Sequence, residues 1–357
     1  MLALTGQPLL VLTTILAIVA IVAVGLLVWF AGRGSAMTRG RRLAVVGGVA
    51  ALAVVGQAFA VGATSLEVND QYGFYSNWAD LLGSGPGAAP ITTNGLLAPG
   101  EGSVKLVRVP AHAGGTDEKV LIWMPPGFDP HAASRYPVVM FLPGQPSTPQ
   151  MTLRRFSFAS TAAKLIDAHQ IRPFVAVFPV LMIAPPRDTE CTDIKGGPSA
   201  ETWLDHDVPA FVSRHFDVQP PGHGWSVLGW STGAFCAAKI LISHPNEFGS
   251  AASFGGYYAP EEDHTTGDLF GGDPKLHNEN SPIWLYAHHG GLRGSRLLLI
   301  AGRQDKETWK ETARMLYATA GDPAVSSIAF PRGGHNYNNY QAFLAPALLW
   351  SARTWPE

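Results

Sequence analysis

The chain has 357 residues, of which 46% are apolar and only 15% are charged, and its formal net charge is −2. This composition excludes a disordered charged tail and a coiled coil, and the presence of only two cysteines excludes a disulfide-dense mini-protein. The charge is unevenly distributed. Residues 1–63 carry four arginines and no acidic residue, which leaves 21 basic and 27 acidic residues, a net charge of −6, for the rest.

Two long runs without charge flank the arginines, at residues 9–31 and 43–64. Either run is long enough to cross a hydrocarbon core of about 30 Å as an α-helix. The arginines between them favour a cytoplasmic connection, which places the N-terminus and everything after residue 65 outside the cytoplasm. Two alternatives are a signal peptide with Ala58-Phe59-Ala60 as its cleavage site and a pair of helices buried in a soluble core.

We therefore expect a two-span membrane anchor over residues 1–64, a connector over 65–101 and an extracytoplasmic domain over 102–357. In the last of these, short β-rich runs alternate with helical stretches. Such alternation predicts an α/β fold with a mainly parallel sheet and helices on both faces. The predicted strands are 104–109, 119–124, 136–142, 174–180, 225–230, 251–254, 296–301 and 326–330, and the predicted helices are 153–169, 201–216, 233–243, 306–320 and 338–353.

The sharpest local signal is Gly229-Trp230-Ser231-Thr232-Gly233, which follows an apolar run and opens a predicted helix. This is the context of a nucleophile elbow, in which a tight strand-to-helix turn presents a serine at the end of the sheet. The flanking positions must be small, and the helix N-terminus adds partial positive charge where an oxyanion would form. The pattern predicts Ser231 as a nucleophile, and the alternative is a tight turn with an inert serine.

A serine nucleophile needs a base and an orienting acid, and in this fold class the acid and then the histidine follow it along the chain. Asp305 lies just past the predicted strand 296–301, where such folds carry functional groups, and Glu307 is the alternative acid. His335 is the only histidine beyond Asp305, and it lies in a glycine-rich turn before the last predicted helix. We therefore predict a catalytic triad of Ser231, Asp305 and His335.

An oxyanion hole requires two backbone N–H donors. One is predicted at Thr232, directly after the nucleophile. The other is predicted at Gln145, where the Pro143-Gly144 turn that ends the predicted strand 136–142 leaves the next N–H free to point inward.

The cysteines predict a disulfide, whereas the remaining histidines and acidic residues predict no metal site and no cofactor. An exported domain favours a disulfide between Cys191 and Cys236, and the alternative is a pair of thiols. His288-His289 has no second ligand cluster at zinc-like spacing, and Asp205-His206-Asp207 is expected to form a solvated helix face. No glycine-rich loop of the phosphate-binding type precedes a helix, and a domain charge of −6 argues against nucleic acid as a partner.

Several segments together resemble those of a known family. They are Tyr136–Gly144, Glu201–Leu204 with Asp207–Pro209, the serine elbow, His244-Pro245 with Phe248, and Gly334–Tyr337 with Tyr340. On these segments, residues 102–353 resemble the bacterial putative-esterase family, which groups esterase D-type hydrolases, feruloyl esterases and the secreted mycolyltransferases of mycobacteria. The resemblance implies an α/β-hydrolase fold and acyl-ester chemistry through the three triad residues. The membrane-anchored arrangement and both cysteine contexts are similar to those of uncharacterised actinobacterial members.

Two departures separate the chain from the mycolyltransferases. The Gln145-Pro146-Ser147-Thr148 loop lacks the acid and the arginine with which they hold trehalose, and the acid stands at Asp305 rather than at a glutamate slightly further on. We therefore predict a membrane-anchored, extracytoplasmic serine esterase that acts on a small-molecule or lipid ester. The alternatives are a cell-envelope acyltransferase with the same triad and an inactive hydrolase fold that serves as a scaffold.

Overall fold

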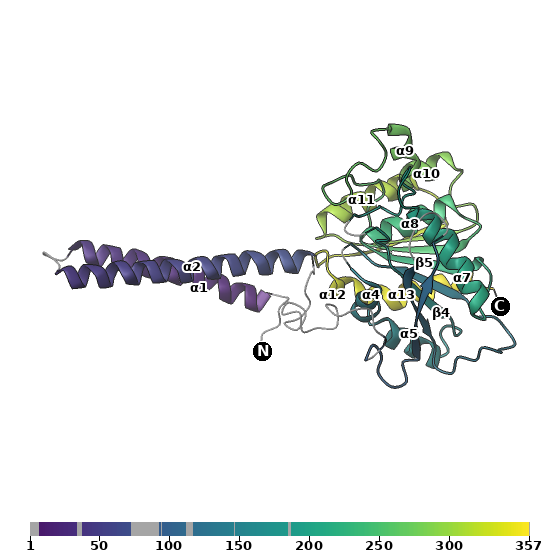
Figure 1. Cartoon of the computed structure of the whole chain (residues 1–357), viewed down its shortest axis with the longest axis horizontal. Coiled ribbons are helices and arrows are strands. Elements are labelled where there is room, and N and C mark those ends of the chain that lie inside the picture. Colours follow the sequence, from purple (N-terminus) through teal and green to yellow (C-terminus); the bar gives the residue numbers. More distant parts are fainter. Residues whose placement is uncertain are drawn as a thin grey trace. The chain divides into compact units, whose positions relative to one another are not determined.

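The structure, a computed structural model, describes residues 7–33, 38–72, 93, 95–111, 117–145, 147–184 and 187–356 (Figure 1). The chain divides into two compact units, Met1–Ala88 and Ala89–Glu357. Most of the predicted connector, residues 73–92 and 94, lies outside the described residues.

The first unit is a pair of helices, α1 (Gln7–Arg33) and α2 (Arg39–Tyr72). By length and composition both can cross a membrane, over Pro8–Arg33 and Arg39–Asn69. The second helix continues to Tyr72, past the end of its apolar run at residue 64, because no glycine or proline interrupts the mostly polar residues that follow.

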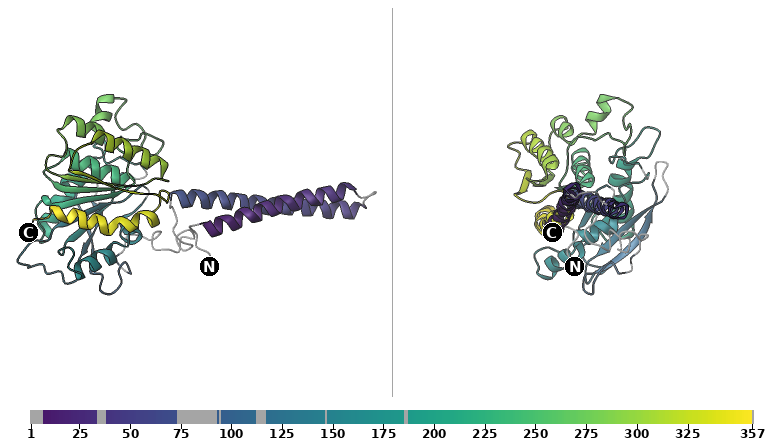
Figure 2. Two further views of the ribbon diagram at one scale, coloured as in Figure 1. Left: turned by 180° about the vertical axis from the view of Figure 1, so that it is seen from behind. Right: turned by 90° about the vertical axis from the view of Figure 1, so that its left-hand side faces the viewer.

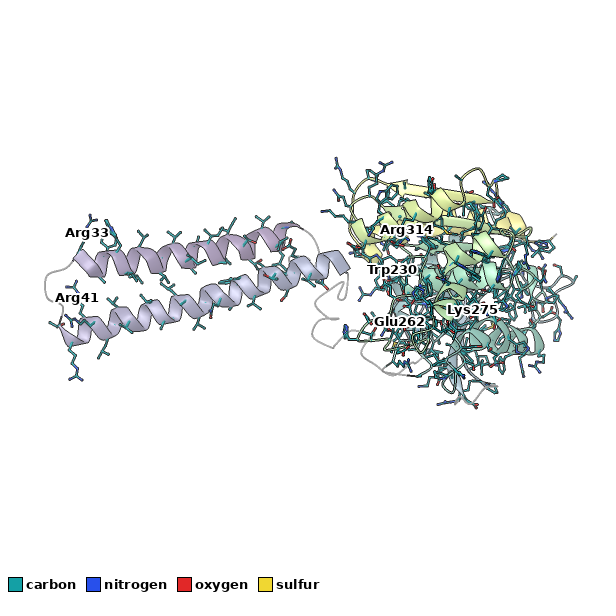
Figure 3. All side chains as sticks on the ribbon, turned by 90° about the horizontal axis from the view of Figure 1, so that it is seen from above. Arg33, Arg41, Trp230, Glu262, Lys275 and Arg314 are labelled. Atoms are coloured by element: carbon teal, nitrogen blue, oxygen red, sulfur yellow. A yellow bond between two sulfur atoms is a disulfide. The ribbon has the colours of Figure 1, made fainter. Side chains whose placement is uncertain are left out.

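Small side chains form the contact between α1 and α2. Ala17 and Ala20 are buried, and a Cβ added at Gly56 would lie 3.2 Å from the Cβ of Ala20. Helices in a bilayer usually pack closely through small residues, because the hydrophobic effect does not drive their association in lipid. Figure 3 shows Arg33 and Arg41 at the same end of this helix pair.

A mixed sheet of eight strands forms the centre of the second unit, in the order β1-β2-β4-β3-β5-β6-β7-β8. The strands β1 and β2 pair antiparallel with each other, and β2 pairs antiparallel with β4, whereas all the pairs from β4 to β8 are parallel. The strands are β1 (Ser103–Val109), β2 (Glu118–Met124), β3 (Val138–Leu142), β4 (Val175–Pro179), β5 (Gly222–Trp230), β6 (Phe248–Phe254), β7 (Arg296–Gly302) and β8 (Val325–Phe330).

Helices cover both faces of this sheet (Figure 2). Alternate residues of β3 point to opposite sides, so that Met140 joins one apolar core and Phe141 the other. One face is covered by α7 (Val208–His215), α8 (Thr232–Ser243), α10 (Pro282–His288) and α11 (Lys306–Ala318), and the other by α4 (Pro149–Arg155), α5 (Phe158–Asp167) and α13 (Leu344–Ser351). The predicted mainly parallel sheet between two helical layers is confirmed.

Three predicted helices are interrupted in the structure. The predicted helix 153–169 divides into α4 and α5 at Ser157, whose φ of 48° cannot continue a helix. The predicted helix 201–216 divides into α6 (Ala200–Thr202), a π-helical turn (Trp203–Asp207) and α7. The last predicted helix, 338–353, consists of α12 (Tyr337–Tyr340) and α13 with 3₁₀ turns at Gln341–Phe343 and Ala352–Thr354.

Two short helices were missed, α9 (Pro274–Glu279) and α10. Each begins with a proline at its first position, and the side chain of the preceding Asp273 or Ser281 accepts a hydrogen bond from a backbone N–H of the first turn. These capping signals stand in the sequence, but six- and seven-residue helices show too little apolar periodicity to be predicted from it.

Candidate active site

Ser231 lies in a strained turn between the end of β5 and the start of α8, with φ 57° and ψ −120°. Non-glycine residues rarely adopt a positive φ, and such strain is concentrated at functional sites. The turn closes only because its flanking residues are glycine. A Cβ at Gly229 would lie 1.8 Å from the carbonyl oxygen of Gly233, and a Cβ at Gly233 would lie 2.4 Å from the carbonyl oxygens of Leu142 and Pro143.

His335 connects Ser231 to Asp305. Its Nε2 lies 3.0 Å from Ser231 Oγ, and its Nδ1 lies 2.7 Å from Asp305 Oδ2. The turn between β8 and α12 carries this histidine, and the indole of Trp230 stacks on the imidazole with ring centroids 4.3 Å apart and an interplanar angle of 20°. The structure therefore brings together three side chains from three separate loops at the carboxyl end of the parallel strands.

Asp305 is buried at the start of α11, directly after β7. Burial alone would raise its pKa, but hydrogen bonds from His335, Thr308 and Tyr340 lower it below the ordinary value. The alternative acid, Glu307, is exposed on α11. The carboxylate that contacts the histidine is therefore that of Asp305.

Tyr340 holds the same oxygen of the Asp305 carboxylate that faces the histidine. Its hydroxyl donates to Asp305 Oδ2 at 2.7 Å and accepts from the Gly302 N–H at 3.2 Å. Burial and the neighbouring charge of Asp305 raise the pKa of this tyrosine, so it remains a hydrogen-bond donor. No role for Tyr340 is predicted from the sequence. The sequence signal for Tyr340 is an aromatic side chain five positions after His335.

The two predicted oxyanion donors flank the elbow. Thr232 is the first residue of α8, so its N–H has no intrahelical acceptor and lies at the positive end of the helix. Gln145 follows Gly144, where an added Cβ would lie 3.0 Å from Ser231 Cβ and 2.9 Å from Trp230 Cδ1. The turn that carries Gln145 therefore packs directly against the nucleophile.

The Asp205-His206-Asp207 segment is not the solvated helix face that the sequence analysis expected. Asp205 and Asp207 are buried on the π-helical turn, and Asp205 Oδ2 lies 2.9 Å from the Nε2 of His244. The prediction failed because a π-helical turn contains more residues than an α-helical turn, which rotates the acidic residues toward the core.

A buried ionic network surrounds these residues. Glu201 lies 3.2 Å from the Nε2 of His244 and 3.0 Å from the Nζ of the fully buried Lys239. Burial alone would lower the pKa of His244, but the two carboxylates raise it to about 10. Burial would likewise raise the pKa of Glu201, yet Lys239 and His244 lower it to about 2.

Cys191 and Cys236 form a disulfide that joins the loop after β4 to α8. The Nδ1 of His288 donates a hydrogen bond to the Trp284 carbonyl oxygen, 2.8 Å away, on the outer side of α10. Among the described residues, no group of three histidine, cysteine, aspartate or glutamate side chains could hold a metal ion.

Comparisons with known proteins identify the family of the chain and the fold of its second unit. Residues 111–354 match the family described as putative esterase. An uncharacterized protein of Corynebacterium glutamicum is 26% identical over 274 residues, which cover 70% of this chain and 62% of that protein. The chain thus spans less than two thirds of the length of this curated relative.

Solved esterase structures share the fold of the second unit. A ferulic acid esterase superposes with a TM-score of 0.61 at 15% identity, covering 71% of this chain and 97% of its own. An S-formylglutathione hydrolase from Agrobacterium tumefaciens gives a TM-score of 0.61 at 18% identity, with coverages of 73% and 98%. A fluorophosphonate-binding serine hydrolase of Staphylococcus aureus gives 0.59 at 15% identity, with coverages of 70% and 98%. At these identities the likeness establishes the fold, which is the predicted α/β-hydrolase fold.

Proposed function

Because this chain belongs to the putative-esterase family, we propose that it is a serine esterase that hydrolyses carboxylic esters through Ser231, His335 and Asp305. One observation carries the proposal. Ser231 stands on a strained elbow, and its Oγ begins a hydrogen-bonded chain that runs through both nitrogens of His335 to the buried carboxylate of Asp305.

In the acylation step, Ser231 Oγ attacks the ester carbonyl carbon while His335 Nε2 takes the hydroxyl proton. Asp305 stabilises the imidazolium and holds the tautomer in which Nδ1 carries a proton. The negative charge that develops on the carbonyl oxygen is accepted by the N–H groups of Thr232 and Gln145. Collapse of this intermediate breaks the ester bond, and His335 returns its proton to the departing alcohol.

In the deacylation step, water loses a proton to His335 Nε2 as its oxygen attacks the acyl-serine, and the proton then returns to Ser231 Oγ as the acid leaves. A sugar or lipid hydroxyl could replace water in the same step, which would make the protein an acyltransferase. The membrane anchor proposed below supports lipid-derived esters as substrates but does not choose between the two acceptors.

Labelling with a fluorophosphonate probe and hydrolysis of p-nitrophenyl esters test the proposal. We expect the wild-type protein to be labelled and active, and Ser231→Ala to lose both properties. Ser213→Ala is a matched control, because this serine lies on α7 and its hydroxyl has no hydrogen-bond partner among the described residues. A wild-type protein that is neither labelled nor active would instead support the scaffold alternative. Acyl transfer to an added alcohol in preference to water would favour an acyltransferase.

We also propose that α1 and α2 anchor the protein in a membrane, with their arginine-rich connection in the cytoplasm and the second unit outside. Support comes from the length of both apolar helices, the arginines at one end of the pair, and a disulfide that suits an oxidising compartment.

Both native cysteines are bonded, so a single introduced cysteine can report topology. A membrane-impermeant maleimide should label Tyr317→Cys in intact cells, because Tyr317 is 87% exposed, and should label Thr38→Cys only after lysis. The opposite pattern would overturn this orientation, and a mature chain that starts near residue 61 would indicate a cleaved signal peptide.

A further inference from the structure

A hydrogen bond joins the loop of the predicted oxyanion donor Gln145 to the loop of the proposed base His335. The hydroxyl of Tyr337 donates to Ser147 Oγ at 2.7 Å. Ser147 lies two positions after Gln145 in the first loop, and Tyr337 follows His335 at the same spacing in the second. One side-chain contact therefore connects two loops that are 190 residues apart along the chain.

Gln145 lies in a tight turn that Ser147 closes. The Ser147 N–H donates to the Gly144 carbonyl oxygen at 2.7 Å, so that Gln145 is the second residue of a four-residue turn. The N–H of that residue takes no part in the hydrogen bond of the turn, which leaves it for another acceptor. At the start of the turn, a Cβ added at Gly144 would lie 3.0 Å from Ser231 Cβ. The N–H of Gln145 therefore directly follows a residue that packs against the nucleophile.

The ring of Tyr337 is enclosed by aromatic and charged neighbours. Its centroid lies 5.2 Å from that of Trp230, which stacks on the imidazole of His335. The centroid of Phe156 is 5.7 Å away, and the Arg155 guanidinium lies 5.5 Å from the tyrosine ring. Only 6% of the tyrosine is exposed, and burial raises its pKa to about 12, so that the hydroxyl keeps its proton and remains a donor.

We propose that Tyr337 is a positioning residue that fixes the turn carrying Gln145 through the Ser147 hydroxyl, and so aligns one N–H donor of the oxyanion hole. The inference rests on the proposed function, because only an acyl-transfer reaction at Ser231 forms an oxyanion there. Such a donor must be in place before the reaction, since a preorganised hydrogen bond costs no rearrangement in the transition state. Without the phenol hydroxyl, the turn keeps its backbone hydrogen bond but loses its link to the histidine loop, and the donor is less well aligned.

Hydrolysis of a p-nitrophenyl ester by full-length Tyr337→Phe and Ser147→Ala tests this link. Each substitution removes one hydroxyl of the pair and leaves the ring or the backbone turn in place. Removal of an oxyanion donor lowers kcat about 10²–10³-fold, so a misaligned donor should lower it less, about tenfold, with little change in KM. Because both hydroxyls belong to one contact, the double variant should lose no more activity than either single variant.

Two further measurements separate this effect from a change at the histidine. A trifluoromethyl ketone adds to Ser231 Oγ, and its former carbonyl oxygen becomes an oxyanion, so its inhibition constant should rise about tenfold in both variants. The acid side of the pH profile of kcat/KM should be the same as in wild type. The reason is that the hydrogen bonds of His335 to Ser231 and Asp305 do not include the Tyr337 hydroxyl.

Tyr258→Phe is the matched control. The phenol of Tyr258 is fully buried and also bonds a serine hydroxyl, that of Ser253, at 2.8 Å, but it belongs to the core on the opposite face of the sheet from Tyr337. This variant should leave kcat, KM and the inhibition constant unchanged. Ser147 is half-buried in a loop, so Ser147→Ala carries the test alone if Tyr337→Phe does not fold.

The inference is overturned if either single variant keeps wild-type kcat, or if the two losses multiply in the double variant, because the hydroxyls would then act independently. It is also overturned if the ketone inhibits the variants as strongly as wild type. In these cases a wild-type protein that hydrolyses esters and is labelled by a fluorophosphonate still supports the proposed function. If wild type is neither labelled nor active, the proposed function fails, and this inference fails with it.

Discussion

Replacement of Tyr340 by phenylalanine separates the orientation of the proposed triad from its chemistry. Tyr340 does not contact Ser231 in the hydrogen-bonded chain but donates to Asp305 Oδ2, the same oxygen that faces His335 Nδ1. The variant retains the aromatic ring, which packs on Trp230 and Phe330 with ring centroids 4.7 Å and 5.1 Å away. The substitution therefore removes one hydroxyl and little packing.

The expected loss of stability and activity depends on the two groups to which that hydroxyl is hydrogen-bonded, Asp305 and the Gly302 N–H. A hydrogen bond to a charged group contributes about 1.5–3 kcal/mol net, and leaving the buried Gly302 N–H without its 3.2 Å acceptor adds a further cost of about 1–3 kcal/mol. We expect the free energy of unfolding to fall by about 2–4 kcal/mol, because these two contributions share one hydroxyl and are not additive. If the hydrogen bond to Asp305 contributes its full energy to the transition state, its removal lowers kcat/KM about ten- to hundredfold.

Ester hydrolysis and urea unfolding measure the two effects, with Tyr286→Phe as the control. Tyr286 donates to Asp322 Oδ2 at the same 2.7 Å but lies on α10, outside the triad, so its loss should leave kcat/KM unchanged. The pKa of Asp305 is depressed in the folded protein, so its stabilising contribution is present above pH 3.8 and is lost on further acidification. In Tyr340→Phe this contribution should be smaller, and its loss should be complete at a higher pH than in wild type, because the folded-state pKa lies closer to 3.8. A variant that keeps wild-type kcat/KM while losing stability would refute an orienting role.

Three further changes have defined outcomes. Gly229→Ala places a Cβ 1.8 Å from the Gly233 carbonyl oxygen, so the elbow should not form and fluorophosphonate labelling should be lost. The pKa of His244 is raised to about 10, against the effect of burial, so its contribution to unfolding free energy is full below pH 6.5 and is lost as the pH rises through 10; urea unfolding of His244→Gln should lack this dependence. Reduction of the Cys191–Cys236 disulfide, which links positions 45 residues apart, should lower the unfolding free energy by about 4 kcal/mol, and an unchanged melting temperature would contradict this loop-closure argument.

Local signals were sufficient to locate the residues that the proposed mechanism uses. Ser231 stands in a five-residue pattern between an apolar run and a helix, which is typical of a tight strand-to-helix turn, and Asp305 lies just past an apolar run that predicts a strand. A single histidine remains downstream, so chain order alone selects His335. The parallel sheet could be predicted for a related reason, because strands buried on both faces are continuous apolar runs.

Burial of polar residues could not be predicted in the same way. Asp205 was assigned to a helix surface because the preference of an acid for solvent is the usual guide, and nothing in the local pattern reveals the π-helical turn. Its stabilising partner, His244, follows α8 and is distant in sequence. The burial of Glu190 could not be predicted for the same reason, since its hydrogen-bond donor, Tyr257, lies after a different strand.

One face of α8 explains why these distant residues belong to a single arrangement. Thr232, Cys236 and Lys239 are spaced at i, i+4 and i+7, which places them on the same side of a helix. Cys236 is bonded to Cys191, and Lys239 donates to the Cys191 carbonyl oxygen at 2.8 Å. The second and third turns of the helix, which follow the turn that supplies the proposed oxyanion donor, thus hold the segment at Cys191 in place. The positive φ angles of Glu190 and Cys191 therefore occur in a segment that a disulfide and a hydrogen bond hold to one helix.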